Sequence, residues 1–150
     1  MPLSIFQATP TDAETLGELV HGLLNELSDG EAPDLLPVIQ TTRELLEAQA
    51  ITGFLAFDGD AAVGALTLHR CAAIYAGGHF GEISELFVLP SHRSAGVAAA
   101  LLDQARSYGR SLGWHRLEVG APPQPDWART LAFYEREGFQ ITGPRLRHLL

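Results

Sequence analysis

The sequence predicts an α/β protein, with a mixed and mostly antiparallel central sheet flanked by helices. Three observations support this fold class. The chain has 150 residues and no repeat, low-complexity tract or linker, so residues 1–150 are expected to form a single domain. Runs with strand-like alternation and segments with helical spacing of apolar residues follow one another. Tight turns join some successive strands and helices join others, which produces both antiparallel and parallel pairs.

The composition is that of a globular protein, with 46% of residues hydrophobic and 19% charged. No apolar run reaches the ~20 residues that a membrane-spanning helix needs. The first residues contain no basic, apolar signal segment. We therefore expect a cytoplasmic protein with no membrane partner. The single cysteine, Cys71, excludes an internal disulfide framework.

The charge pattern excludes several classes of function. All ten basic residues are arginine, which rules out Schiff-base lysines and the lysine of a phosphate-binding loop. A net charge of −8 disfavours nucleic acid, because phosphate binding needs a basic face. Residues 1–75 carry eleven acidic side chains and two arginines, whereas residues 76–150 carry seven and eight. This asymmetry would allow one half of the chain to hold an anionic ligand while the other attracts a cation. The alternative is an acidic, solvated surface without functional meaning.

The chain begins with a predicted strand and helix. Residues 3–8 alternate as a strand. Thr11 and Glu14 have the spacing of a capping box at the start of a helix. Apolar residues at helical spacing continue that helix to about Ser28.

A second helix and a hairpin follow. Residues 29–37 form a polar loop with two prolines, and the next helix is predicted from residue 41 or 42 to residue 50. Residues 54–57 and 62–68 alternate as strands on either side of Asp58-Gly59-Asp60, which predicts a β-hairpin.

The second half predicts two further crossovers and a closing strand pair. In order, we expect a strand over 83–89 stopped by Pro90, a helix over 95–112 capped by Gly113, a strand over 114–119, a helix over 126–137, and strands over 139–142 and 146–149.

The turn between residues 89 and 97 is the most informative segment. Arg93, Gly96 and Ala98 have the spacing R-x-x-G-x-A between a strand and a helix. The unpaired N–H groups and the dipole at a helix start suit a phosphate or pyrophosphate. Gly96 lets the backbone approach a ligand closely, and Arg93 can add charge-assisted hydrogen bonds. The spacing alone also fits an ordinary turn with a solvated arginine, but the surrounding elements favour the phosphate interpretation.

Two motifs resemble signatures of the GNAT superfamily of N-acetyltransferases. The first, Ile83-x-x-Leu86-x-Val88-x-Pro90-x-x-Arg93-x-x-Gly96-x-Ala98, resembles the family's acetyl-CoA signature. The second, Ala132-Phe133-Tyr134-Glu135-Arg136-Glu137-Gly138-Phe139, resembles its downstream signature. The order of elements matches the family across essentially the whole chain. The resemblance implies an acyl-CoA N-acyltransferase-like fold and acetyl-CoA as co-substrate, with a homodimer as a family-level expectation.

The resemblance also implies the cofactor contacts. The backbones of Phe87 and Val88 are expected to pair with the pantetheine arm. The pyrophosphate is expected at Arg93 and the turn after it, which comprises Ser94, Ala95, Gly96, Val97 and Ala98. Ser94 and Ala98 stand where glycine is common, and both are small enough for binding.

One family contact is in doubt at the end of the predicted strand over 114–119. The family often has an asparagine there, and this chain has Gly120-Ala121-Pro122-Pro123 instead.

Acetyl transfer to an amine needs a base for the ammonium and an acid for the departing thiolate. A positioned phenol can protonate sulfur, and the resemblance gives this role to Tyr134. Packing is the alternative, because Trp127, Leu131 and Tyr134 share one helix face.

Glu82 and Glu85 are the candidate bases. Three apart on a regular strand, they face opposite sides, so at most one is expected to enter the site. Related enzymes often use a carboxylate on this strand. We choose Glu82 as the base and interpret Glu85 as a surface or amine-steering, substrate-binding carboxylate. A solvated strand end is the alternative for both.

The remaining reactive side chains give weaker signals. Nothing marks Cys71 as an activated acyl carrier, so it is interpreted as a small apolar residue. The six histidines show no metal-ligand spacing, and no metal site is predicted. His79 lies near the expected acceptor side and is a further candidate for substrate binding and amine deprotonation.

The predicted acceptor is the primary amine of a small molecule that attacks acetyl-CoA directly in a ternary complex. Gly81-Glu82-Ile83-x-Glu85-Leu86-x-Val88-x-Pro90 and Arg145-x-Arg147-x-x-Leu150 resemble a small-amine branch that includes aminoalkylphosphonate acetyltransferases. That branch implies a short amine with an anionic end, held by an arginine such as Arg70, Arg145 or Arg147. The acidic first half favours a polyamine or an aminoglycoside-like cation instead. A protein or peptide N-terminal acetyltransferase and a non-catalytic acyl-CoA sensor remain alternatives.

Overall fold

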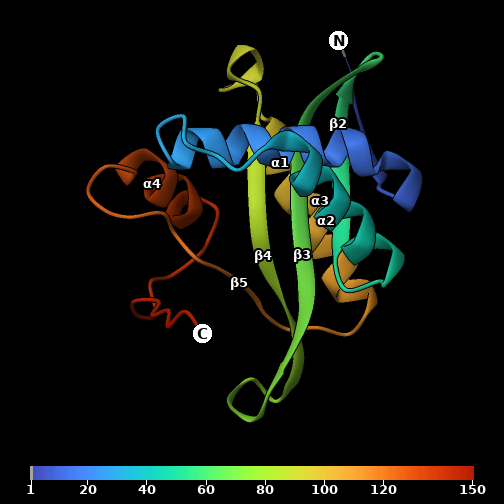
Figure 1. The fold of residues 1–150 in the computed structure, drawn as a ribbon. Helices are drawn as coiled ribbons and strands as arrows, with labels where there is room; N and C mark the ends of the chain where they lie inside the picture. The colour runs from blue at the N-terminus through green and yellow to red at the C-terminus, as the bar shows by residue number, and fades with distance from the viewer. Residues whose placement is uncertain (1) are drawn as a thin grey trace.

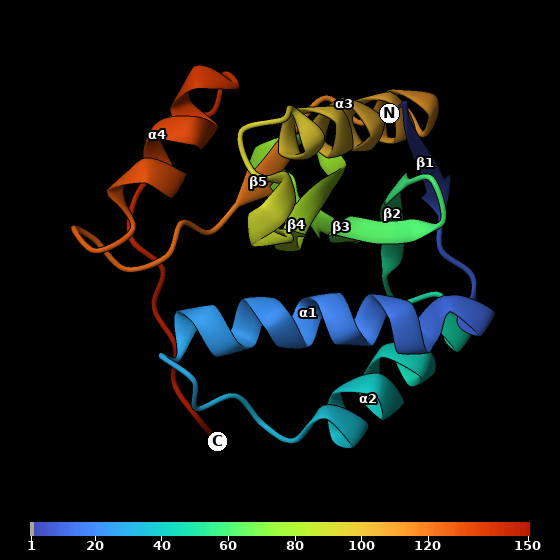
Figure 2. The same ribbon diagram turned by 90° about the horizontal axis from the view of Figure 1, so that it is seen from above.

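The computed structural model describes residues 2–150 and shows a sheet between two layers of helices (Figures 1 and 2). The five strands lie in sequence order across the sheet: β1 (Leu3–Gln7), β2 (Thr52–Asp58), β3 (Ala61–Ala73), β4 (Gly78–Val88) and β5 (Leu117–Val119). The first four pair antiparallel, and β5 pairs parallel to β4. The predicted mixed, mostly antiparallel sheet is therefore confirmed.

The helices divide between the two faces of the sheet (Figure 2). Helices α1 (Ala13–Leu27) and α2 (Leu35–Glu47) cover one face, α3 (Val97–Ser111) covers the other, and α4 (Ala128–Arg136) stands beside β5. Each face has its own apolar core. Leu16 of α1 packs with Leu55 and Phe87, whereas Leu101 of α3 packs with Leu66. Among residues 2–150, no helix has the length and apolarity needed to cross a membrane.

Two helix starts differ from the prediction. The capping box before α1 uses Thr9 and Asp12 instead of Thr11 and Glu14, and the Thr9 N–H donates to Asp12 Oδ2 at 2.8 Å. A short 3-10 turn precedes α1, so the helical turns begin nearer the N-terminus than the sequence pattern predicted. Helix α2 begins at Leu35, well before the expected position, and includes Pro37. A proline is tolerated there because the first-turn N–H groups have no acceptor within the helix.

The β3–β4 hairpin is longer than predicted. Its pairing continues to Ala73 and Gly78, so the hairpin end projects beyond the helical layers (Figure 1). The outer part carries polar and half-exposed side chains that alternate only weakly in hydrophobicity, which is why the sequence pattern ended the first strand too early and began the second too late.

The predicted closing strand pair is wrong, because residues 139–150 contain no strand. Gly143 has a φ of 142°, and the next residue is Pro144, which has no N–H to donate to a ladder. Leu146 and Leu149 are 95% and 74% exposed, so the apolar pattern there marks no core face. Strand β5 also starts late, because Trp114 packs against Gly81 and Gly109 and donates its N–H to the Gly109 carbonyl at 2.9 Å.

Candidate active site

Strands β4 and β5 separate soon after they meet. They share only the pairs Gly81–Leu117, Glu82–Glu118 and Ile83–Val119. Strand β4 then continues to Val88, and within residues 2–150 no strand pairs with it on that side. The predicted pantetheine partners, Phe87 and Val88, lie on this open stretch. The parting of the strands therefore leaves β4 backbone groups available to a bound extended molecule.

A β-bulge places Glu82 and Glu85 on the same face of the sheet. Thr67 pairs with Glu85 and His69 pairs with Glu82, and the ladder shifts register between these pairs because Ser84 is an extra residue in β4. Thr67 and His69 are two apart in β3, so their partners share a face. The expectation that the two carboxylates face opposite sides is wrong, because it assumed a regular strand, but Glu82 lines the cavity beside β5 and Glu85 does not.

This shared face is the one covered by α1. Ala65 and its partner Phe87 belong to the α1 core, and Thr67 follows Ala65 by two residues. The two carboxylates have different partners on it. The Thr67 hydroxyl, on a side chain only 1% exposed, donates to Glu85 Oε1, and the Glu85 N–H donates back to Thr67 Oγ1 at 3.1 Å.

Glu82 has a more adaptable partner. Its Oε1 lies 3.3 Å from Nη1 of Arg145, whose side chain is 68% exposed. An exposed ion pair of this kind contributes little to stability and is easily exchanged for a ligand. Arg145 also lies against Gly120, where a Cβ atom would collide with its guanidinium. The absence of a side chain at Gly120 therefore leaves room for the Arg145 side chain.

The turn before α3 has the backbone shape of an anion cradle. Ser94 and Gly96 both have left-handed conformations, with φ of 64° and 83°, and α3 starts at the next residue, Val97. A Cβ atom on Gly96 would meet nothing within 4 Å, so this side of the turn is open. The first N–H groups of α3 have no acceptor within the helix and carry the positive end of its dipole.

Arg93 is engaged within the protein. Its Nη2 lies 2.5 Å from the Glu26 carboxylate of α1, and its Nε donates to the Val88 carbonyl at 2.9 Å. Its guanidinium also stacks 5.5 Å from the centre of the Phe87 ring. In this arrangement Arg93 fixes the end of β4 to α1.

Glu82 and Tyr134 both line a cavity of about 1410 Å³. Its walls also include Arg145, Gly120 and the segment after β5. Tyr134 is 6% exposed, and burial raises its pKa to about 12. Phe139 packs edge-on against its ring with the centroids 5.5 Å apart. The phenol therefore stays protonated at any physiological pH while it faces the cavity.

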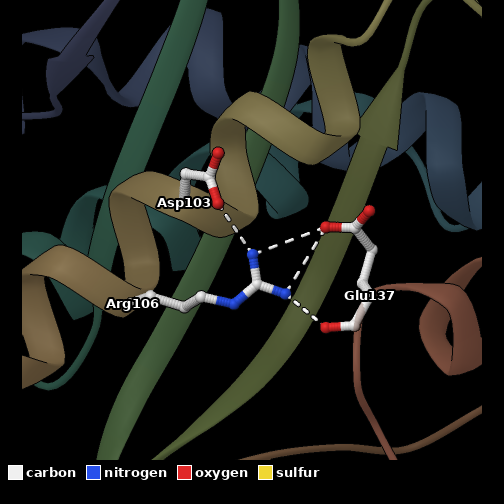
Figure 3. A network of polar contacts seen from close by, with 3 residues as sticks. All are labelled: Asp103, Arg106 and Glu137. Atoms are coloured by element: carbon white, nitrogen blue, oxygen red, sulfur yellow. Dashed lines mark hydrogen bonds and ion pairs between the residues drawn. The ribbon is translucent and has the colours of Figure 1, made fainter.

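An arginine holds α4, and with it Tyr134, against α3 (Figure 3). Arg106 Nη2 donates to the carbonyl of Glu137, at the end of α4, at 2.6 Å. Its Nη1 pairs with Asp103 at 2.8 Å, and the Glu137 carboxylate lies 3.4 Å away. A cation at a helix C-terminus is stabilised by the dipole as well as by these contacts.

Other predicted or overlooked residues have clear positions. His79 pairs with Ala72 and so lies on the opposite face from Glu82, exposed to solvent.

Sequence reasoning missed Thr67 and Arg106. A single polar residue in the apolar run Ala65-Leu66-Thr67-Leu68 was the available signal for Thr67, whereas nothing in the sequence distinguishes Arg106 from the other arginines.

Comparison with known proteins assigns this arrangement to a family. The sequence model of the Acetyltransferase (GNAT) family matches residues 20–139, which include both carboxylates, the turn before α3 and Tyr134. The search of curated proteins found no match to the sequence.

Several solved structures share the fold over nearly the full chain. An aminoglycoside acetyltransferase from an uncultured soil metagenomic sample has a TM-score of 0.80 at 20% identity, over 100% of this chain and 99% of its own. The ribosomal-protein-alanine N-acetyltransferase of Brucella melitensis biovar Abortus 2308 has a TM-score of 0.79 at 20% identity, over 99% of both chains. A predicted acetyltransferase with acetyl-CoA from Clostridium acetobutylicum has a TM-score of 0.80 at 16% identity, over 99% and 96%. At these identities the likeness establishes the fold.

Proposed function

The chain belongs to the GNAT acetyltransferase family, which uses acetyl-CoA as donor, and from this membership we propose that it acetylates the primary amine of a small molecule. Residues 1–150 act as one domain in this proposal. The amine attacks the thioester directly in a ternary complex. The observation that carries the proposal is that Glu82 and a protonated Tyr134 line one and the same cavity, beside the point where β4 and β5 separate.

The proposed donor site combines the open stretch of β4 with the turn before α3. The backbone of Phe87 and the N–H of Val88 pair with the pantetheine arm, whereas the Val88 carbonyl is already engaged by Arg93. Amides from Ser94 to Ala98 bind the pyrophosphate, supported by the left-handed conformations of Ser94 and Gly96.

The proposed chemistry needs one base and one acid. Glu82 removes a proton from the substrate ammonium, and the amine nitrogen then attacks the thioester carbonyl. A C–N bond forms, the C–S bond breaks, and Tyr134 donates its phenolic proton to the departing thiolate, while the nitrogen releases its second proton to solvent. The products are the N-acetylated amine and free coenzyme A, and Tyr134 regains a proton from solvent. Glu85 holds the strand geometry through Thr67.

Arg145 favours an acceptor with an anionic end. Of the three arginines considered for this role, it is the one that lines the cavity, and it already pairs with a carboxylate there. A substrate anion on Arg145 frees Glu82 to act as the base. This matches the resemblance to the small-amine branch, whereas the acidic first half of the chain supports a cationic acceptor less directly.

The test is a panel of acceptors assayed by release of free coenzyme A thiol. We expect turnover with short primary amines that carry a phosphonate or carboxylate, and initial-velocity lines that intersect when both substrates are varied. Polyamines and aminoglycosides serve as the cationic arm, and peptides with free N-termini as the protein arm. Turnover confined to peptides, or parallel velocity lines, would contradict the proposal.

A further inference from the structure

Three side chains of different chemistry converge on the outer part of the β3–β4 hairpin. His69 and Cys71 are two apart in β3, and Glu82 of β4 pairs with His69, so all three lie on one face. One ligand atom from each lies within 4.8 Å of the other two. Among residues 2–150 this is the single group of three or more such side chains that converges in this way.

We propose that His69, Cys71 and Glu82 form a binding site for a divalent thiophilic cation, Zn²⁺ in the first instance. Imidazole nitrogen, thiolate sulfur and carboxylate oxygen are the ligands that zinc uses in proteins. Tetrahedral zinc places its ligand atoms about 3.3–3.8 Å apart, given metal–ligand distances of about 2.0–2.3 Å. The remaining gap is to be closed by side-chain rotation, and all three side chains are half-buried rather than packed in the core. Water fills the fourth position.

The surrounding contacts orient two of the three ligands. His69 Nδ1 lies 3.0 Å from the Ser84 hydroxyl, and a proton donated there leaves the Nε2 lone pair for a metal. Glu82 Oε1 lies 3.3 Å from Arg145 Nη1, an exposed partner that a metal ion can displace. The β-bulge that brings Ser84 into reach of His69 is therefore part of this site as well as of the proposed active site.

The site has a consequence that rests on the proposed function. Glu82 is the proposed base for acetyl transfer and also a proposed metal ligand. A carboxylate bound to zinc no longer accepts a proton from an ammonium group, so metal occupancy and acetyl transfer exclude one another. Zinc is thus expected to inhibit the enzyme reversibly.

Sequence spacing could not reveal this site. Its ligands come from two strands, and the pair His69-x-Cys71 is too short a signal by itself. The sequence prediction of no metal site relied on the spacing of the histidines and on the presence of a single cysteine.

The test is a titration of the reduced, chelator-treated protein with Co²⁺, followed by its absorption spectrum. We expect saturation at one equivalent, with thiolate-to-cobalt charge transfer in the near ultraviolet and visible bands typical of tetrahedral Co²⁺. Added Zn²⁺ should remove these bands by competition. Cys71→Ser should abolish the charge-transfer band. His69→Gln and Glu82→Gln should weaken binding by more than the ~10–100-fold typical of losing an outer-shell partner.

His79→Gln is the matched control, because His79 lies on the same hairpin but on the opposite face. It should bind Co²⁺ like the wild type, and circular dichroism should show all variants folded. Absence of a tetrahedral spectrum, or a spectrum unchanged by Cys71→Ser, would overturn the site. Binding read in this way is independent of turnover: a metal spectrum without inhibition of acetyl transfer would contradict the role of Glu82 as base and leave the metal site standing.

Discussion

The phenol of Tyr134 shows how burial alone suits a residue to the acid role proposed for it. Desolvation raises its pKa to about 12, and its side chain is almost fully enclosed. An unfolded tyrosine titrates near pH 10. The neutral form is therefore favoured in the folded protein, and the proton is present whenever a thiolate has to be protonated.

The same shift predicts how stability depends on pH. As pH rises through 10, the unfolded chain loses the Tyr134 proton first, so the free energy of unfolding falls until the folded phenol titrates near pH 12. At pH 11.5 the expected loss is about 2 kcal/mol. The sequence contains no lysine, so few other groups titrate in this window.

Urea unfolding of the wild type and Tyr134→Phe at pH 9 and pH 11.5 measures this effect. The wild type should lose about 2 kcal/mol more than the variant between these two pH values. Equal losses in the two proteins would show that the phenol is not buried as described.

Residue-level reasoning from sequence assigned residues to the correct elements where a motif fixes their position, and it misjudged the face of a side chain where the strand is irregular. Tyr134 and Gly96 lie in segments whose position follows from helix starts and periodicity. The shared face of Glu82 and Glu85 follows from one extra residue in β4, and no spacing rule signals a bulge. The Thr67–Glu85 contact depends on the same register.

At the scale of elements, the bulge in β4 places two carboxylates on one face of the sheet. Their different partners give them different proposed roles. Glu82→Gln removes the proposed base and should lower kcat by about 10²–10⁴-fold. Glu85→Gln is the matched control, because the amide oxygen can still accept from Thr67. It should retain kcat within about tenfold, a change too small for loss of a general base.

Steady-state kinetics of the two variants, with the substrates found in the acceptor panel, gives the comparison. Thermal unfolding should show both variants folded. A larger loss of kcat in Glu85→Gln than in Glu82→Gln would reverse the assignment of the base.

Elements were predicted well where a strong pattern coincides with tertiary packing. Helices α1 and α3 and the β2–β3 hairpin agree with their apolar periodicity and turn residues. The start of α2 was missed because Pro37 reads as a helix breaker in sequence, although a first-turn position tolerates it. The last strand pair failed because apolar residues after Gly143 lie exposed, and exposure cannot be deduced from hydrophobicity alone.

At the scale of the whole molecule, the sheet brings the distant segments of the proposed site together. Strand β4 supplies the carboxylate and the open backbone, α3 supplies the turn, and α4 supplies the phenol through its anchor on Arg106 (Figure 3). The charge asymmetry follows the same division. The acidic half forms α1, α2 and the first strands, whereas the arginine-rich half forms the turn and the walls of the cavity.

The most direct test of this assembly is Tyr134→Phe, with acetyl-CoA affinity measured by calorimetry and acetyl transfer measured on the same preparation. Removal of the phenolic oxygen should lower kcat by about 10²–10⁴-fold and leave the dissociation constant of acetyl-CoA unchanged, because the proposed donor contacts lie on β4 and the turn before α3. Unchanged turnover, or a protein that binds no acetyl-CoA at millimolar concentration, would contradict the account.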